Sequence, residues 1–370
     1  MCASLKPVTR RASAGFDYAA SLNTQAMSAS QGSQEQPVPP HAQLVQMAMA
    51  HWVSHITYVA AHLGVADHLA AGALSADELA ELTSTHPPSL YRLLRTLASL
   101  GIVREDEAQR FGLTALGEAL RTGAPGSARA TILTLASDWW MRGFGELLHS
   151  VQTGRPGFEK HLGMPIFEWL AQNPEQASLF SETMVGFHGA EPPAVAAAYD
   201  FSGLACIVDI GGATGHLLTT ILAANPASTG ILFDLPHVVS DAPALIEARG
   251  LSNRITIESG SFFDGVPTGG DAYLLSHIIH DWSEEQCLTI LRHCRQAMHP
   301  SSRLLIIEMV LPPGNTPHPG KMLDMMMLVG PGGRERTAEE YGALLGKAGL
   351  RLTQIVPTQS PVSLVEAVPA

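Results

Sequence analysis

The stretch Cys206–His216 reads CIVDIGGATGH and decides the expected fold. Apolar residues lead into Asp209 and a glycine-rich turn, and residues 217–224 then read as a helix. A strand, a tight glycine turn and a helix form the entry to a nucleotide-type site in an open α/β sheet. Glycine is needed in such a turn because a Cβ would block it and keep a ligand away from the backbone.

The spacing of this turn argues against two common nucleotide motifs. Counted from Gly211, the dinucleotide pattern GxGxxG would need glycine where Ala213 and His216 stand. No Lys or Arg lies within ten residues, which argues against a pyrophosphate cradle or a P-loop. An adenosine ligand without phosphates fits better, because Asp234 ends the next apolar run, 25 positions after Asp209, where ribose hydroxyls are held. A plain turn with a capping Asp is the alternative.

The composition favours a globular protein of about two domains. The chain has 370 residues, of which 46% are hydrophobic, and its net charge is −12. This acidity argues against a nucleic-acid or membrane-surface partner. No apolar run approaches the roughly 18 residues of a membrane span. The four cysteines lack metal-ligand or disulfide spacing, so we expect a reducing, cytoplasmic location.

Three segments of the chain differ in pattern. Residues 1–40 are rich in Ser, Gln, Ala and Pro and lack apolar periodicity, which predicts a disordered tail. An upstream start or a tag would explain that tail, and Met27 is a possible alternative start. Residues 41–190 read as helices that form a dimerisation and substrate-lid domain. Residues 191–370 alternate between strands and helices.

One part of the helical segment is typical of a winged helix. A helix at 90–101 is followed by two short runs, 102–104 and 109–114, that predict a hairpin-like wing. This order invites a DNA-binding interpretation. However, residues 41–125 carry five Arg, no Lys and eight acids, a net charge of −3, whereas a phosphate-reading surface should be basic. We therefore favour dimerisation through the long apolar helices.

The alternating segment predicts a doubly wound sheet of seven strands. Only a short turn separates the last two apolar runs, so the final strand should pair antiparallel. The runs that we expect as strands are 204–210, 230–235, 254–257, 271–279, 303–311, 350–356 and 362–368.

Polar side chains at the ends of these runs are the candidate catalytic residues, because ligands of open α/β sheets sit at the carboxyl ends of the strands. The fourth run leads to His280, the fifth to Glu308, and the segment after two glycines brings Glu335. An imidazole titrates near neutrality and can take a phenolic proton, while a carboxylate on its other nitrogen fixes the tautomer. Helix capping or packing is the alternative role for His280, and His277 reads as a core residue of the strand.

Five motifs in order resemble the class I S-adenosylmethionine-dependent O-methyltransferases of the caffeic-acid/acetylserotonin type and their bacterial relatives. The resemblance covers about residues 42–370, and it implies a Rossmann-like methyltransferase domain behind an N-terminal helical, winged-helix-like dimerisation domain. The motifs are Val208–Gly215, Phe233–Pro236, Gly260–Phe263, His280–Ser283 and Gly332–Thr337.

The resemblance also assigns the cofactor-binding residues. Gly211 would lie against the methionine part of S-adenosylmethionine, and Asp234 would hold the ribose. Ser261 and Phe262 would flank the adenine, with Ser261 standing where plant members often carry Asp. Ser276, where plant members often carry Lys, completes the predicted cofactor residues.

The implied activity is methylation of a hydroxyl group on an aromatic secondary metabolite, phenolic or N-hydroxy heterocyclic. His280 is then the general base, bracketed by Glu308 and Glu335. We expect a homodimer that uses no metal, releases S-adenosyl-L-homocysteine and binds neither nucleic acid nor membrane. Two alternatives stay open: a hydroxylase or decarboxylase of the same fold that uses the same cofactor, and a non-catalytic winged-helix regulator.

Overall fold

The computed structural model describes residues 38–370, so nearly all of the predicted disordered tail lies outside the described residues. Within them the chain divides into two compact units. One contains residues 38–189 and 328–332, and the other contains residues 190–327 and 333–370.

The second unit is an α/β unit built on one large sheet. Each apolar run predicted above forms a strand of this sheet, so the strand prediction is confirmed. The strands are β4 (Cys206–Ile210), β5 (Thr229–Asp234), β6 (Ile255–Ser259), β7 (Ala272–Ser276), β8 (Arg303–Glu308), β11 (Leu350–Pro357) and β12 (Ser363–Pro369). The helices are α13 (Glu191–Ala198), α14 (His216–Ala224), η1 (Val239–Asp241), α15 (Ala242–Ala248), η2 (Ile279–Asp281), α16 (Glu284–Ala297), α17 (Pro319–Val329, ending in the other unit) and α18 (Ala338–Lys347).

The sheet has the strand order β11-β12-β8-β7-β4-β5-β6. The five strands from β6 to β8 run parallel, whereas β12 pairs antiparallel with both β8 and β11, as predicted for the final strand. A further parallel pair, β9 (Val310–Leu311) and β10 (Arg336–Thr337), was not predicted. The central strands β4, β7 and β8 are apolar almost throughout because helices cover both faces of the sheet.

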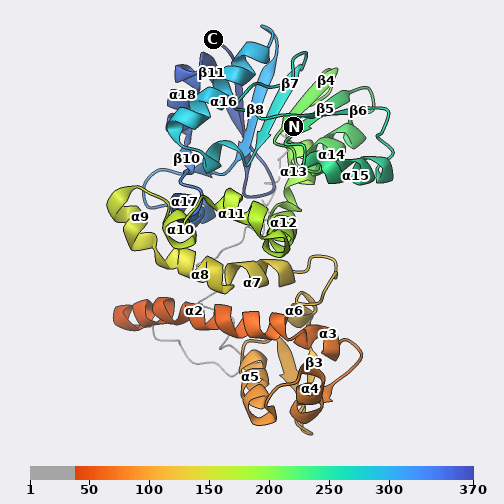
Figure 1. Ribbon diagram of the computed structural model, residues 1–370, viewed down its shortest axis with the longest axis vertical. Coiled ribbons are helices and arrows are strands. Elements are labelled where there is room, and N and C mark those ends of the chain that lie inside the picture. The colour runs from red at the N-terminus through yellow and green to blue at the C-terminus, as the bar shows by residue number, and fades with distance from the viewer. Residues whose placement is uncertain (1–37) are drawn as a thin grey trace, which may run out of the picture. The chain divides into compact units, whose positions relative to one another are not determined.

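Two hydrophobic cores fill the two faces of this sheet. Helices α13, α14 and α15 cover one face, and α16 and α18 cover the other (Figure 1). Alternate residues of a strand enter different cores: Ile207 packs with the first group of helices, and Val208 packs with the second. The carboxyl ends of the parallel strands lie together at one end of the sheet, where the predicted site residues stand.

The first unit is mainly helical and contains a small sheet. Its elements are α2 (Pro40–His62), α3 (Val65–Leu69), β1 (Leu74–Ser75), α4 (Ala76–Thr83), α5 (Pro87–Ser99), β2 (Val103–Glu105), β3 (Arg110–Leu113), α6 (Ala115–Glu118), α7 (Arg129–Leu135), α8 (Asp138–Gly145), α9 (Leu147–Thr153), α10 (Gly157–Leu162), α11 (Ile166–Gln172) and α12 (Pro174–His188).

The hairpin predicted in this unit is confirmed by the antiparallel pairing of β2 and β3. The strand β1 adds a third strand to it, so the helical segment is not purely helical. Two residues are too few to show strand periodicity, which is why the sequence did not predict β1. A capping box formed by Ser75 and Glu78 starts α4.

Helix α2 presents apolar side chains that the rest of the described chain does not cover. Leu44 and Met47 are 68% and 67% exposed, and Trp52 is 54% exposed. Burial of such side chains against another surface is favourable, at roughly 25 cal/mol per Å² of apolar area. None of the described helices is both long and apolar enough to cross a lipid bilayer.

Candidate active site

The glycine turn after β4 holds the backbone in a shape that side chains rarely allow. Gly211 has φ +69°, and its N–H donates to the carbonyl of Phe233 at 2.8 Å. A Cβ at Gly211 would come within 2.4 Å of the Ile278 side chain and 3.7 Å of the Phe262 ring. Glycine is therefore required here by both conformation and space. Gly211 and Phe262, from two predicted cofactor motifs, lie close together.

Asp234 ends β5 and binds the turn directly. One carboxylate oxygen accepts the N–H of Ala213 at 2.9 Å, and the other accepts the N–H of Leu235 at 2.7 Å. Burial raises the pKa of Asp234, although these two hydrogen bonds oppose the shift. The carboxylate therefore lies beside the glycine turn, as the sequence predicted, and has lone pairs left to accept hydroxyl groups.

The other predicted cofactor residues follow the neighbouring strands. Ser261 comes just after β6, and its hydroxyl accepts the N–H of Phe263 at 3.2 Å. Phe262 packs its ring 4.9 Å from that of Phe263 and 5.9 Å from that of Trp282, between centroids. Ser276 is the last residue of β7 and is half-buried.

Asp209, inside β4, is a buried carboxylate beneath the turn. It is 1% exposed, and neither of its oxygens makes a hydrogen bond of good geometry among the described residues. Burial, followed by the charge of Asp234, raises its pKa to about 7, although the backbone N–H of Leu218 opposes the shift. A Cβ at Gly212 would lie 2.6 Å from this carboxylate. Buried carboxylate acceptors suit a ligand that brings hydroxyl groups and positive charge, so Asp209 and Asp234 fit S-adenosylmethionine.

The catalytic candidates meet at the same edge of the sheet. His280 lies in η2 after β7, and its Nδ1 is 2.6 Å from Oε1 of Glu335. Because an ionised carboxylate only accepts, Nδ1 carries the proton and Nε2 is left as the basic nitrogen. Oε1 of Glu308, at the end of β8, accepts the backbone N–H of His280 at 3.1 Å. The structure thus brings together the three residues that the sequence singled out.

A close backbone contact places Glu335 beside His280. The N–H of Arg334 donates to the carbonyl of His280 at 2.8 Å. A Cβ at Gly333 would lie 1.8 Å from that carbonyl oxygen, so only glycine permits the approach. The backbone N–H of Glu335 also donates to Asp324 of α17 at 2.9 Å. A capping box formed by Thr337 and Glu340 then starts α18.

The charges around His280 favour its protonated form. Burial lowers the pKa of the imidazole, but the carboxylates of Asp281, Glu335 and Glu308 outweigh burial and raise it to about 10. Nε2 lies 3.7 Å from the carboxylate of Asp281. Burial raises the pKa of Glu335, although the hydrogen bond to His280 opposes that shift. A base in this position gains its neutral form only as the pH rises.

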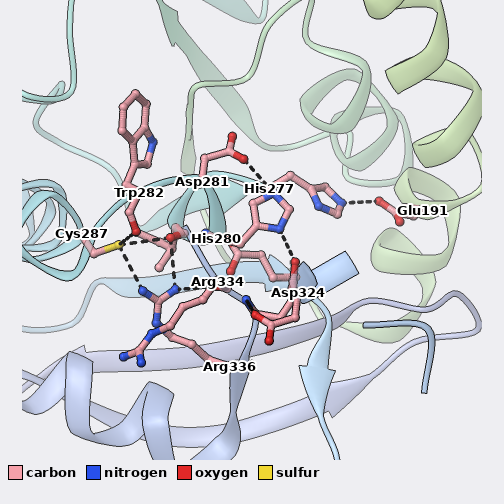
Figure 2. Close-up of polar contacts among 12 residues, drawn as sticks. Glu191, His277, His280, Asp281, Trp282, Cys287, Asp324, Arg334 and Arg336 are labelled. Atoms are coloured by element: carbon pink, nitrogen blue, oxygen red, sulfur yellow. Dashed lines mark hydrogen bonds and ion pairs between the residues drawn. The ribbon is translucent and has the colours of Figure 1, made fainter. Parts of the chain in front are cut away.

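His277 differs from its predicted role as a core residue within the strand. It lies beyond the end of β7 with φ +54°, and its Nε2 is 2.7 Å from a carboxylate oxygen of Glu191. Its ring centroid is 5.2 Å from that of His280. Figure 2 shows His277 turned toward Glu191. The strand ends earlier than its apolar run because the chain turns into the left-handed region here.

Arg336, Cys287 and Tyr341, whose roles the sequence did not indicate, bind the residues next to His280. Arg336 is fully buried and donates to the carbonyl of Ile279 at 3.2 Å, with its guanidinium directed at Cys287 (Figure 2). The thiol of Cys287 donates to the same carbonyl at 3.1 Å. The phenol of Tyr341 donates to Glu308. The sequence around Arg336 is polar, so it gave no signal that this side chain is buried.

Comparison with known proteins identifies the family. Residues 144–351 match the O-methyltransferase domain, and residues 45–123 match the O-methyltransferase dimerisation domain. The chain belongs to the O-methyltransferase family. It is 42% identical over 332 residues to the phenazine O-methyltransferase PhzM of Lysobacter antibioticus, covering 90% of this chain and 97% of that protein. This match confirms the resemblance of the sequence motifs to S-adenosylmethionine-dependent O-methyltransferases.

Two further relatives show what the family binds and how it varies. The crystal structure of the O-methyltransferase NcsB1 from neocarzinostatin biosynthesis, in complex with S-adenosylmethionine and 2-hydroxy-5-methyl naphthoic acid, has a TM-score of 0.76 and 35% identity. It covers 86% of this chain and 96% of that one. Aclacinomycin 10-hydroxylase RdmB of Streptomyces purpurascens is 37% identical over 299 residues, 80% of each chain. Members of similar sequence therefore differ in reaction.

Proposed function

We propose that this protein methylates a hydroxyl group of an aromatic secondary metabolite and that His280 is the general base. The observation that carries the proposal is the 2.6 Å contact between Nδ1 of His280 and Glu335. This contact leaves Nε2 to accept the proton of a phenolic or N-hydroxy group, while the carboxylate stabilises the imidazolium that forms. The oxygen of the acceptor gains the electron pair of its O–H bond and becomes the nucleophile.

The cofactor residues have separate tasks in this proposal. S-adenosylmethionine, when bound, supplies an electrophilic methyl group on a sulfonium centre. Asp234 would accept the ribose hydroxyls, Gly211 would let the ligand approach the backbone, and the ring of Phe262 would pack on the adenine. Ser261 and Ser276 would add neutral hydrogen bonds. Fixing both reactants on one rigid sheet edge supplies much of the acceleration, because it removes a bimolecular encounter.

The test compares His280→Gln with His299→Gln, using a panel of phenols and N-hydroxy heterocycles. His299 lies 3.4 Å from Asp271 at the opposite edge of the sheet, so it is a matched histidine–carboxylate pair. We expect kcat of His280→Gln to fall about 100-fold or more, with donor affinity and His299→Gln activity unchanged. Unchanged turnover in His280→Gln would show that His280 is not the general base.

Hydroxylation is the second candidate, because the relative RdmB is named as a hydroxylase. The buried pair of His280 and Glu335 favours methylation, since a neutral imidazole that donates from Nδ1 to the carboxylate presents Nε2 to accept a hydroxyl proton. The mass of the product separates the two reactions: methylation adds one CH2, and hydroxylation adds one oxygen.

We also propose that the chain works as a homodimer. The match to the dimerisation domain begins at residue 45, inside α2, where the exposed apolar side chains lie. Leu44→Glu combined with Met47→Glu should release monomers, because charges cannot be buried there without partners. Light scattering of the unchanged protein should give twice the chain mass. A monomer at micromolar concentration would contradict this assignment.

A further inference from the structure

The loop that carries Ser261 and Phe262 forms a single turn, and one of its carbonyls is bound by a side chain from another element. The N–H groups of Asp264 and Gly265 both donate to the carbonyl of Ser261, at 2.9 and 3.2 Å. The next carbonyl, that of Phe262, lies 2.9 Å from Nδ1 of His293 in α16. Because a carbonyl oxygen only accepts, Nδ1 of His293 is the donor. His293 therefore ties the loop to α16.

Helix α16 gives His293 a fixed position. The helix begins at a capping box formed by Ser283 and Gln286, which satisfies its first backbone N–H groups. Ile290 and Cys294, which lie one turn before and one residue after His293, are completely buried against the sheet. His293 itself is half-buried. A side chain on such a packed helix orients its partner more precisely than a side chain on a loop.

Phe262 connects this hydrogen bond to the glycine turn. Its carbonyl accepts from His293, and its ring lies near Gly211, where a Cβ would be 3.7 Å from Cε1 of the ring. The ring centroid is also 5.9 Å from that of Trp282. The direction in which a side chain leaves the backbone depends on the backbone conformation. A bond that fixes the peptide of Phe262 therefore also fixes where its ring lies.

We propose that His293 is a positioning residue that holds the ring of Phe262 in place for contact with the adenine of S-adenosylmethionine. The proposal rests on the proposed function, which assigns Phe262 to the adenine. Without the donor, the carbonyl of Phe262 loses its partner in α16, and the loop gains conformations. The ligand must then order the loop when it binds, which weakens its affinity. His280 takes no part in this contact, so the chemical step should be little affected.

The experiment compares His293→Leu with His293→Asn. Leucine replaces much of the imidazole but cannot donate, whereas the amide nitrogen of asparagine can take the place of Nδ1 and donate. Isothermal titration calorimetry with S-adenosylhomocysteine measures the affinity. We expect His293→Leu to weaken binding about fivefold, as for the loss of one neutral hydrogen bond, and His293→Asn to stay within about twofold of the unchanged protein.

Arg295→Leu is the matched control on the same helix. Nε of Arg295 donates to the carbonyl of Gly349, just before β11, at 3.2 Å. Arg295 thus also ties α16 to a backbone carbonyl, but to one outside the predicted cofactor motifs. Arg295→Leu should therefore leave the affinity for S-adenosylhomocysteine unchanged. This control separates the general loss of a helix contact from the loss of the bond to Phe262.

Two further measurements distinguish positioning from a merely structural role. In His293→Leu, KM for S-adenosylmethionine should rise about fivefold, while kcat at saturating donor stays within about twofold of the unchanged protein. In a Phe262→Ala background, His293→Leu should cause no further loss of affinity, because the imidazole acts through the ring of Phe262. If His293→Leu does not fold, His293→Ala takes its place in both measurements.

Equal affinity of His293→Leu and the unchanged protein would overturn the proposal. A loss that His293→Asn does not restore, or that persists in the Phe262→Ala background, would overturn it as well. Failure of the proposed function has different signatures: full turnover by His280→Gln removes the base, and unchanged affinity in Phe262→Ala removes the adenine contact. Calorimetric affinity does not depend on turnover, so these failures are distinguishable.

Discussion

The amino ends and the carboxyl ends of the parallel strands differ in how their charged groups are hydrogen-bonded. We call these two ends of the sheet its amino-terminal and carboxyl-terminal edges. At the amino-terminal edge, one carboxylate oxygen of Asp271 accepts the N–H groups of Ala205 and Cys206 at 2.7 and 2.9 Å. The guanidinium of Arg254, just before β6, donates to three backbone carbonyls, including that of Ser228. The N–H groups of Cys206 and Ala205, opposed by burial, lower the pKa of Asp271. Charge at this edge serves the fold.

The carboxyl-terminal edge leaves charge unsatisfied. Neither oxygen of Asp209 makes a hydrogen bond of good geometry among residues 38–370, and one oxygen of Glu335 lacks a partner there. Burial raises the pKa of Asp209, Asp234 and Glu335. One sheet therefore carries stabilising polar groups at one end and costly ones at the other. We infer from this difference that a buried carboxylate with a raised pKa at the carboxyl end of a strand indicates a ligand-binding site.

The largest effect should come from Asp234→Asn, which tests the ligand role of the carboxyl edge. The amide accepts hydrogen bonds without the help of a charge, so affinity for S-adenosylhomocysteine should fall about 100-fold. Isothermal titration calorimetry measures it. The control is Asp241→Asn, an exposed carboxylate in η1 that should keep the affinity of the unchanged protein. Equal affinities in the two variants would discredit Asp234 as the ribose ligand.

A smaller effect, on stability, should come from Asp209→Asn. The pKa of Asp209 rises from an ordinary value of 3.8 to about 7, so the folded protein holds a proton that the unfolded chain releases. Stability from this group is complete below pH 3.8 and is lost as pH rises through 7. Asp209→Asn should therefore raise the free energy of unfolding at pH 8 by about 2 kcal/mol. Urea unfolding at pH 5 and pH 8 measures the change.

The control for that prediction is Asp271→Asn at the amino edge, where the sign reverses. A lowered pKa contributes stability above the ordinary carboxyl value and loses it as pH falls through the folded value. Asp271→Asn should cost about 1 kcal/mol at pH 8, and the cost should disappear in acid. If both variants change stability in the same direction at pH 8, the contrast between the two edges is wrong.

The sheet was predictable because both of its faces are covered. Strands such as β7 and β8 are then continuous apolar runs, and their ends point directly to His280 and Glu308. Glu335 was predictable from the two glycines before it. The five-motif resemblance added the cofactor residues, whose contact with a ligand remains a prediction.

Other parts of the site left no periodic signal in the sequence. Tyr341 reads as an ordinary core residue of a helix, and only the fold brings it to Glu308. Arg336 reads as a surface charge because Glu335 and Thr337 beside it are polar, yet it is completely buried. His277 leaves its strand through a left-handed backbone that its apolar neighbours do not predict. Contacts between elements that are far apart in the sequence determine the burial and orientation of these three side chains, so the local sequence pattern does not predict them.

The approach of Gly333 to the carbonyl of His280 has a consequence for engineering the enzyme. A single methyl group at position 333 would push the two backbones apart, and the carboxylate of Glu335, two residues further on, would move with the chain. Substitutions there cannot tune the site gradually. Variant libraries that aim to change acceptor preference should therefore keep this loop unchanged. They should vary the side chains that face the acceptor, because a poor substitution there reduces activity without displacing the backbone of the site.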